Sequence, residues 1–217
     1  MALHEYKLRD GTGVPSVTTI LSRFKESGAL INWAWKQGKA GLDYRETRDR
    51  AANSGTVAHT LVERHIKNEP LGEWGSLNVP PEVEEKGRSA FEAYRTWERH
   101  SRLKIMHTEV SLVSERYRFG GTLDAIGLLD GLLCLLDWKS SNGIYMDYAI
   151  QVAAYKALWE ENRPGELLTG GYHICRFSKN DDDFEHRYFG KLPEAWELFK
   201  TYLRAYDLNL LLKKRIR

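Results

Sequence analysis

Residues 117–141 read YRFGGTLDAIGLLDGLLCLLDWKSS, and this stretch decides the fold. Residues 117–128 are strand-like, and residues 132–139 form a dense apolar run that ends in Asp-Trp-Lys, as a buried central strand would. Leu129-Asp130-Gly131 lies between the two runs, and Asp-Gly is a strong signal for a tight hairpin turn. The sequence therefore predicts two neighbouring antiparallel strands.

Two acidic residues, Asp124 and Asp137, stand near matching ends of these strands. The hairpin brings them close, and close carboxylates repel unless a cation lies between them or one of them takes up a proton. Oxygen ligands select a hard divalent ion such as Mg²⁺, which can polarise a phosphate and make hydroxide available near neutral pH. Lys139 shares a strand face with Asp137, so its amine is placed to orient a water or stabilise negative charge. The pattern predicts a metal site for phosphate chemistry.

A simpler interpretation of Asp137 and Lys139 is a solvated ion pair, which is what an isolated Asp-x-Lys on a strand usually is. Here the motif follows a run of leucines, and charges at the end of so buried a strand are costly unless they serve a site or reach solvent. Asp124, at the matching point of the preceding strand, is a second reason to favour the site.

The other elements follow from hydrophobic periodicity, which repeats every 3.6 residues in a helix and every two in a strand. Helices are expected over about 55–66, 83–97, 146–162 and from Pro193 onward, and strands over 105–114, 170–177 and 184–189. This order predicts a mixed α/β sandwich with the sheet in the middle.

Two details of the strands are also expected. Gly120-Gly121 indicates a bend or bulge. Within 105–114, Glu109 is expected on one face and four side chains on the other: Met106, Thr108, Val110 and Leu112.

Composition limits the class of protein. A chain of 217 residues fits one domain. The net charge of +2 gives no general attraction for polyanions, so such a site must come from local clustering. Cys134 and Cys175 lie in apolar runs, as core residues of a reducing compartment do.

We expect a cytoplasmic protein of a prokaryote or a virus-infected cell, because no signal or transit peptide and no apolar stretch of about 20 residues is visible.

Four further residues are candidates for the site. His59 lies on the apolar stripe of its helix, where it could pack in the core or bind a metal. Glu109 could point at the cleft or at water. Gln151 and Tyr155 lie four residues apart on one helix face, so they either pack or hydrogen-bond the site and its ligand.

Residues 21–50 interleave aromatic and cationic side chains. This pattern suits a single nucleic-acid strand, because bases stack on rings while phosphates meet the charges. An ordinary amphipathic helix pair with a solvated charged face explains the segment equally well. The candidate contacts are Trp33, Trp35, Lys36, Lys39, Arg45 and Arg48.

The site candidates follow one another in an order that resembles the PD-(D/E)XK nuclease superfamily, specifically its RecB-like branch. The matching residues are His59, then Gly121 with Asp124, then Asp137 with Lys139, then Gln151 with Tyr155. Within that branch the chain is most similar to the mitochondrial genome maintenance exonucleases, over roughly residues 14–160. The shared stretches are Pro15-Ser16-Val17-Thr18, Gly55-x-x-x-His59 and Asp137-Trp138-Lys139-Ser140-Ser141.

The resemblance implies cleavage of single-stranded DNA from a free end, with Mg²⁺ or Mn²⁺. It implies that His59, Asp124, Asp137 and the Trp138 carbonyl surround the metal, that Lys139 is catalytic, and that Glu109 is a weaker match. Side chains that would support the site or the DNA are Ser16, Thr18, Ser140, Gln151 and Tyr155.

The resemblance also sets domain and partner expectations. Residues 15–67 would be a helical, DNA-engaging part and residues 82–217 the catalytic core of a single nuclease domain over 1–217. Partners would be single-stranded DNA and replication or recombination proteins, with no membrane. The chain departs from relatives that carry an iron–sulfur cluster, because it lacks their clustered cysteines, and from the mitochondrial ones, because no organelle-targeting extension is visible.

Three other functions compete with a single-strand exonuclease. One is a structure-specific or duplex DNA endonuclease of the same superfamily. Another is a non-catalytic DNA-binding module, which the intact Asp124, Asp137 and Lys139 argue against. An exonuclease of another fold with only acidic metal ligands is disfavoured by the short Asp-x-Lys spacing. Digestion polarity, DNA versus RNA preference and oligomeric state stay open.

Overall fold

The computed structural model describes residues 5–25, 28–44 and 54–216. At its centre is a five-stranded sheet in the order β3-β4-β5-β6-β7. Neighbouring strands are antiparallel except β5 and β6, which are parallel and are joined by a crossover through α6 (Met146–Asn162). The strands are β3 (Lys104–Ser114), β4 (Phe119–Leu129), β5 (Leu132–Ser140), β6 (Tyr172–Phe177) and β7 (Phe184–Phe189).

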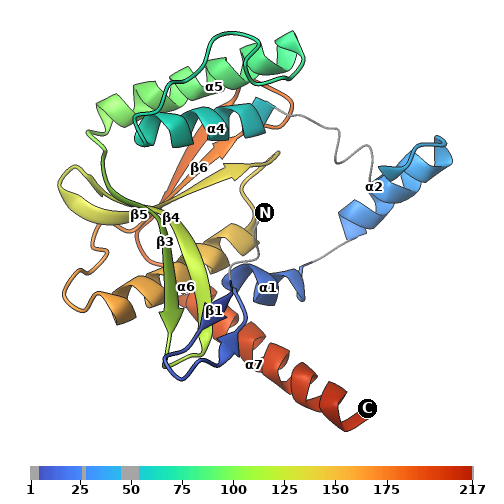
Figure 1. The fold of residues 1–217 in the computed structure, drawn as a ribbon, viewed down its shortest axis with the longest axis vertical. Helices are drawn as coiled ribbons and strands as arrows, with labels where there is room; N and C mark the ends of the chain where they lie inside the picture. The colour runs from blue at the N-terminus through green and yellow to red at the C-terminus, as the bar shows by residue number, and fades with distance from the viewer. Residues whose placement is uncertain (1–4, 26–27, 45–53, 217) are drawn as a thin grey trace.

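Helices cover both faces of the sheet (Figure 1). Helices α4 (Ser54–Ile66) and α5 (Pro81–His100) lie on one face, and α6, α7 (Pro193–Ile216) and the short α1 (Val17–Ser22) lie on the other. This arrangement confirms the mixed α/β sandwich, and the β4–β5 hairpin turns at Asp130-Gly131 as expected, with both residues at positive φ.

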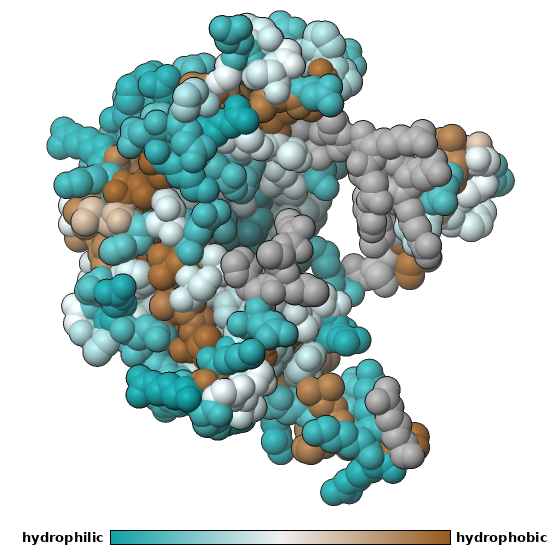
Figure 2. Space-filling view, viewed as in Figure 1, coloured by the Kyte–Doolittle hydropathy of each residue, from teal (hydrophilic) through white to brown (hydrophobic). Residues whose placement is uncertain are grey.

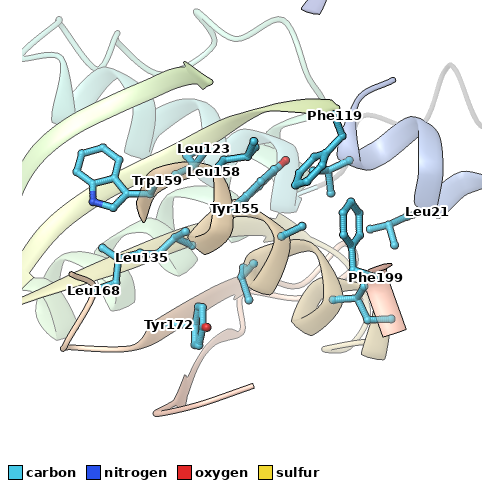
Figure 3. Packing of buried hydrophobic residues seen from close by; sticks show 14 of the residues in the cluster. Leu21, Phe119, Leu123, Leu135, Tyr155, Leu158, Trp159, Leu168, Tyr172 and Phe199 are labelled. Carbon is cyan, nitrogen blue, oxygen red and sulfur yellow. The ribbon is translucent and has the colours of Figure 1, made fainter. Parts of the chain in front are cut away.

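Side chains of the sheet alternate between two cores. Leu135 of β5 packs into the core on the α6 side, and Leu136 packs into the core on the α4–α5 side. Figure 3 shows the first core, where Trp159 and Tyr155 of α6 lie against the sheet and Phe119 meets Phe199 of α7. The two cysteines, Cys134 and Cys175, are buried and free, as predicted.

Helix α4 contributes to the hydrophobic core on its side of the sheet. Val57, Ala58, Leu61 and Val62 of α4 are buried against α5 and the sheet. Helix α4 therefore packs as part of the layer that covers this face of the sheet.

The paired glycines do not form the expected bend or bulge. Gly120 and Gly121 pair regularly with Val113 and Leu112 of β3. A Cβ at Gly120 would lie 2.3 Å from the Tyr6 ring, and one at Gly121 would lie 2.8 Å from Tyr155 Cε1. These glycines admit two tyrosine rings close to the backbone. Tyr6 belongs to a small separate sheet of β1 (Tyr6–Lys7) and β2 (Gly13–Val14).

The regular alternation expected for β3 is also wrong. The register with β4 shifts between Ile105 and His107, and Met106 is exposed. Glu109 has a φ of 51°, a conformation that L-residues rarely adopt. An extra residue and a left-handed one each break the alternation. Of the four side chains expected on one face of β3, Val110 and Leu112 pack against the α6-side core.

Helix α2 (Gly28–Lys39) lies apart from the sheet and its covering helices (Figure 1). The space-filling view shows it across an open space from the main body (Figure 2), and Trp35 and Ile31 are largely exposed. In the described part of the chain, no helix combines the length and the apolar character needed to cross a membrane.

Candidate active site

The sheet opens at two acidic residues. Strands β4 and β5 pair from Leu129 with Leu132 as far as Ala125 with Leu136, and the backbone pairing ends there, one residue before Asp124 and Asp137. At this point Asp124 Oδ2 accepts a 2.9 Å hydrogen bond from the backbone N–H of Trp138. Beyond the last backbone pair, the Asp124 carboxylate thus accepts the Trp138 N–H in place of a backbone carbonyl of β4.

Strand β4 is distorted at the same place. Leu123 packs on the α6 side and Ala125 on the α4–α5 side, although a regular strand would put both on one face. On β3, Thr108 and Val110 pair with Ala125 and Leu123, so Glu109 with its positive φ lies beside Asp124. The irregular backbone presents both acidic residues to the same region.

Asp137 and Lys139 form a buried ion pair. Lys139 Nζ lies 2.6 Å from Asp137 Oδ2, and the Asp137 side chain is completely inaccessible. Burial raises the pKa of Asp137 well above its usual value; the charge of Lys139 opposes this shift and that of Asp124 adds to it. Burial lowers the pKa of Lys139, but the charges of Asp137 and Asp124 outweigh burial and raise it. Lys139 therefore stays protonated.

A small cavity of about 50 Å³ lies on the α4 side of the opening. Among the residues that line it are His59 and Glu63 of α4, Glu109 of β3, Asp124 of β4 and Trp138 of β5. This volume exceeds the roughly 10–15 Å³ that one water requires. His59, Glu109, Asp124 and Trp138, predicted from four separate segments, thus meet around one cavity.

Two ion pairs shape this cavity. His59 Nδ1 lies 3.1 Å from Glu63 Oε1, one helical turn along α4. Lys67 Nζ lies 3.2 Å from Glu109 Oε2. Sequence reasoning missed Glu63 and Lys67, although Glu63 follows His59 at the spacing that places two side chains side by side on a helix.

The acidic side chains and the imidazole of this region are of the kinds that bind divalent cations. Neither carboxylate oxygen of Asp137 has a hydrogen bond of acceptable geometry within residues 5–25, 28–44 and 54–216, although both are buried. A buried carboxylate with no hydrogen bond is costly, and Lys139 compensates only one of its oxygens. In the same described ranges no three His, Cys, Asp or Glu side chains already form a metal-binding group. Two carboxylates and an imidazole would have to move closer together, or be joined by further ligands, to complete a shell.

Gln151 and Tyr155 lie on the other side of the acidic pair. Gln151 Nε2 donates a 2.7 Å hydrogen bond to the Tyr155 hydroxyl, and both side chains are buried. Burial raises the pKa of Tyr155, and the charges of Asp137 and Asp124 raise it further. The pair is therefore packed in the core close enough to feel the charges of both acids, and its hydrogen bonding to the site or to a ligand stays a prediction.

The remaining candidates lie in different surroundings. Ser16 caps α1, where its Oγ accepts a 2.9 Å hydrogen bond from the Thr19 N–H, and Thr18 is exposed beside it. Ser140 ends β5. On α2, Trp33 meets Tyr44 edge-on and Lys39 lies 5.0 Å from the ring of the exposed Trp35.

Three more cations are predicted to contact nucleic acid: Lys36, Arg45 and Arg48. Lys36 is exposed near the end of α2. Arg45 and Arg48 lie outside the described residues. Helix α2 therefore offers exposed cations and an exposed ring, and its role in binding a ligand stays a prediction.

Comparisons with known proteins give distant matches. No protein-family model and no curated protein matches the chain. In shape it is similar to a candidate exonuclease from Eubacterium rectale, with a TM-score of 0.47 and 14% identity over 68% of this chain and 64% of that one, so it spans less than two thirds of that protein. The protein SSO0001 is similar with a TM-score of 0.36 and 11% identity over 76% of this chain and 74% of that one. Neither similarity assigns an activity to this chain.

Proposed function

We propose that this protein is a metal-dependent nuclease, an exonuclease that hydrolyses phosphodiester bonds of single-stranded DNA from a free end. The observation that carries the proposal is the buried Asp137 carboxylate. It lies beside Asp124 and is ion-paired with Lys139 at the place where β4 and β5 separate. Folding such charges into a core is costly unless a site needs them.

The residues proposed to hold the cation are Asp124, Asp137, His59 and the carbonyl of Trp138, with Glu109 as a weaker candidate. Mg²⁺ and Mn²⁺ suit this set of mainly oxygen donors. A bound ion of this kind supplies a Lewis acid for the scissile phosphate and lowers the pKa of a water. The Asp137 carboxylate is buried and only one of its oxygens is ion-paired, with Lys139, and this arrangement and the cavity beside Asp124 support the assignment.

The chain's own groups have distinct roles in this proposal. Lys139 remains charged and partly accessible, so its amine donates to the attacking water or to the negative charge that develops on the phosphate. Asp124 is oriented by the Trp138 N–H. Gln151 and Tyr155 close the α6 side of the site and hold each other in place.

The order of motifs shared with RecB-like nucleases supports the choice of DNA as substrate and of repair, recombination or replication as setting. Helix α2, with its exposed Trp35 beside Lys39, suits a strand-contacting role for the N-terminal part. A duplex or structure-specific endonuclease of the same superfamily is the alternative, because the same acidic pair would serve either reaction.

End-labelled DNA distinguishes these functions. We expect the protein to degrade a linear single strand with Mg²⁺, to leave a covalently closed single-stranded circle intact, and to lose all cleavage with EDTA. Cleavage of the circle would favour the endonuclease. Binding without cleavage of any DNA would favour a binding module.

Lys139→Ala tests the catalytic assignment in the same assay. Removal of a charge-stabilising donor costs about 10²–10³ in rate. Lys156→Ala is the matched control. Lys156 lies on α6 and also forms an ion pair, with Glu160 at 2.8 Å. Unchanged cleavage by Lys139→Ala would contradict the assigned role.

A further inference from the structure

Two tyrosines connect the site to the surface. The Tyr148 ring centroid lies 5.3 Å from Lys139 Nζ. Tyr145 meets Tyr148 edge-on, with ring centroids 5.6 Å apart and planes at 73°. Tyr148 is partly buried, whereas Tyr145 is 48% exposed. The rings of Tyr148 and Tyr145 therefore form an aromatic surface that extends from the amine of Lys139 to the solvent.

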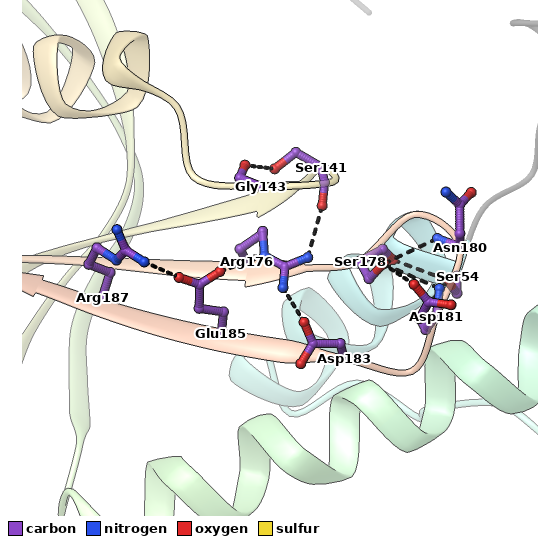
Figure 4. Close-up of polar contacts among 10 residues, drawn as sticks. All are labelled: Ser54, Ser141, Gly143, Arg176, Ser178, Asn180, Asp181, Asp183, Glu185 and Arg187. Atoms are coloured by element: carbon purple, nitrogen blue, oxygen red, sulfur yellow. Dashed lines mark hydrogen bonds and ion pairs between the residues drawn. The ribbon is translucent and has the colours of Figure 1, made fainter.

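The loop that carries Tyr145 is fixed by the end of the sheet. Arg176 Nη1 donates to the Ser141 carbonyl at 3.2 Å, and the Ser141 hydroxyl donates to the Gly143 carbonyl at 2.8 Å (Figure 4). Arg176 is itself buried and paired with Asp183 and Glu185 of the β6–β7 hairpin. A surface that is held in place before binding loses little conformational freedom when a ligand arrives.

A second cation lies beside these rings. Lys25 Nζ lies 2.8 Å from Asp147 Oδ2, and its side chain is 60% exposed. The hydrogen bond to Asp147 raises the pKa of Lys25, and the nearby Tyr148 and Tyr145 raise it further. Rings interleaved with cations are the arrangement that suits a single nucleic-acid strand.

We propose that Tyr145, supported from behind by Tyr148, is the stacking platform for a nucleobase next to the phosphodiester that Lys139 contacts. This inference rests on the proposed function and adds a base-binding subsite to it. A base lies one sugar away from its phosphate, and the Tyr148 centroid lies 5.3 Å from Lys139 Nζ, so a base that neighbours a phosphate at Lys139 would be near these rings. Stacking uses the face that every base presents, so the subsite tolerates any base.

Strand binding without cleavage tests the platform. The probe is a short fluorescent single-stranded oligonucleotide, and its dissociation constant is measured with Ca²⁺, a hard cation with oxygen ligands, in place of Mg²⁺. We expect Tyr145→Ala to weaken binding about 5- to 150-fold, the loss expected for one stacked base. Tyr145→Phe and Tyr145→Trp keep the ring and should remain within about twofold of the parent.

Tyr188→Ala is the matched control, because Tyr188 is 55% exposed on β7. It should leave binding unchanged. Equal losses for Tyr145→Ala and Tyr188→Ala, or no loss for Tyr145→Ala, would overturn the platform.

Single abasic sites locate the base. A set of oligonucleotides carries one abasic site each, at successive positions. With the parent protein, an abasic site at one of these positions should weaken binding. With Tyr145→Ala, an abasic site at that same position should have no such effect. The same penalty in both proteins would overturn the inference.

Failure of the inference and failure of the proposed function give different results. If the parent protein cleaves DNA but Tyr145→Ala binds normally, only the platform is wrong. If Tyr145→Ala weakens binding while no protein cleaves, the platform stands and the nuclease assignment fails. If the parent protein binds no strand, both fail.

Discussion

The Asp124 carboxylate accepts a hydrogen bond from the backbone N–H of Trp138, the residue between Asp137 and Lys139. This contact joins β4 to β5 beyond the last backbone pair of the two strands, Ala125 with Leu136. It fixes Oδ2 of Asp124. This hydrogen bond ties Asp124 to the backbone of the residue that follows Asp137 and so holds the two acids near each other.

Glu63 is expected to orient His59 for metal binding. With a carboxylate at Nδ1, Nε2 is the ring nitrogen left to bind a metal, and removing such a partner typically costs 10- to 100-fold in metal affinity. Glu63→Gln should weaken Mn²⁺ binding by about this factor, measured by calorimetry. Glu92→Gln, on the exposed side of α5, should not. Equal affinities for parent and Glu63→Gln would show that His59 does not ligate.

Gly121 is expected to be required for packing. An added Cβ would lie 2.8 Å from the Tyr155 ring, and overpacking of this kind costs about 1–3 kcal/mol. Gly121→Ala should lower the melting temperature by about 2–12 °C. Gly13→Ala is the control, because an added Cβ there would meet nothing within 4 Å and its φ lies outside the left-handed region. Matching melting curves for Gly121→Ala and parent would contradict this account.

Stability should fall in mild acid because of two histidines. His173 Nδ1 lies 2.8 Å from His186 Nε2. Burial lowers the pKa of both, and the neighbouring His173 helps to lower that of His186 to about 4. The unfolded chain binds protons more readily, so this contribution is complete above pH 6.5 and is lost as the pH falls toward about 4.

Urea unfolding from pH 7 to pH 4 checks this dependence. His186→Phe should flatten the loss of unfolding free energy relative to the parent, whereas His100→Gln, at the exposed end of α5, should not. The difference between variant and parent isolates the pair, because carboxylates also titrate in this range. Parallel curves for parent and His186→Phe would exclude the histidines as the cause.

The sequence predicts the elements but not their irregularities. Asp130-Gly131 between apolar runs suffices for the β4–β5 hairpin, and the spacing of Gln151 and Tyr155 suffices to place them on one helix face, because both patterns are local. The left-handed Glu109 and the separation of the strands at Asp124 depend on contacts between distant segments.

The same limit applies to smaller features. Gly120 and Gly121 indicate a bend in the sequence because glycine often marks one, but Tyr6 and Tyr155 occupy the space beside them. Tyr145 and Tyr148 give no signal in the sequence, since their value comes from the position of Lys139 on another element.

Mn²⁺ binding measured by titration calorimetry, on the parent protein and on Asp124→Asn and Asp137→Asn, tests the central claim most directly. The account predicts that the parent binds the ion and that each substitution abolishes or strongly weakens binding. It also predicts that Glu197→Gln, which breaks an exposed ion pair with Lys200 on α7, binds like the parent. Undiminished binding by both asparagine variants would contradict the claim that these two acids hold the ion.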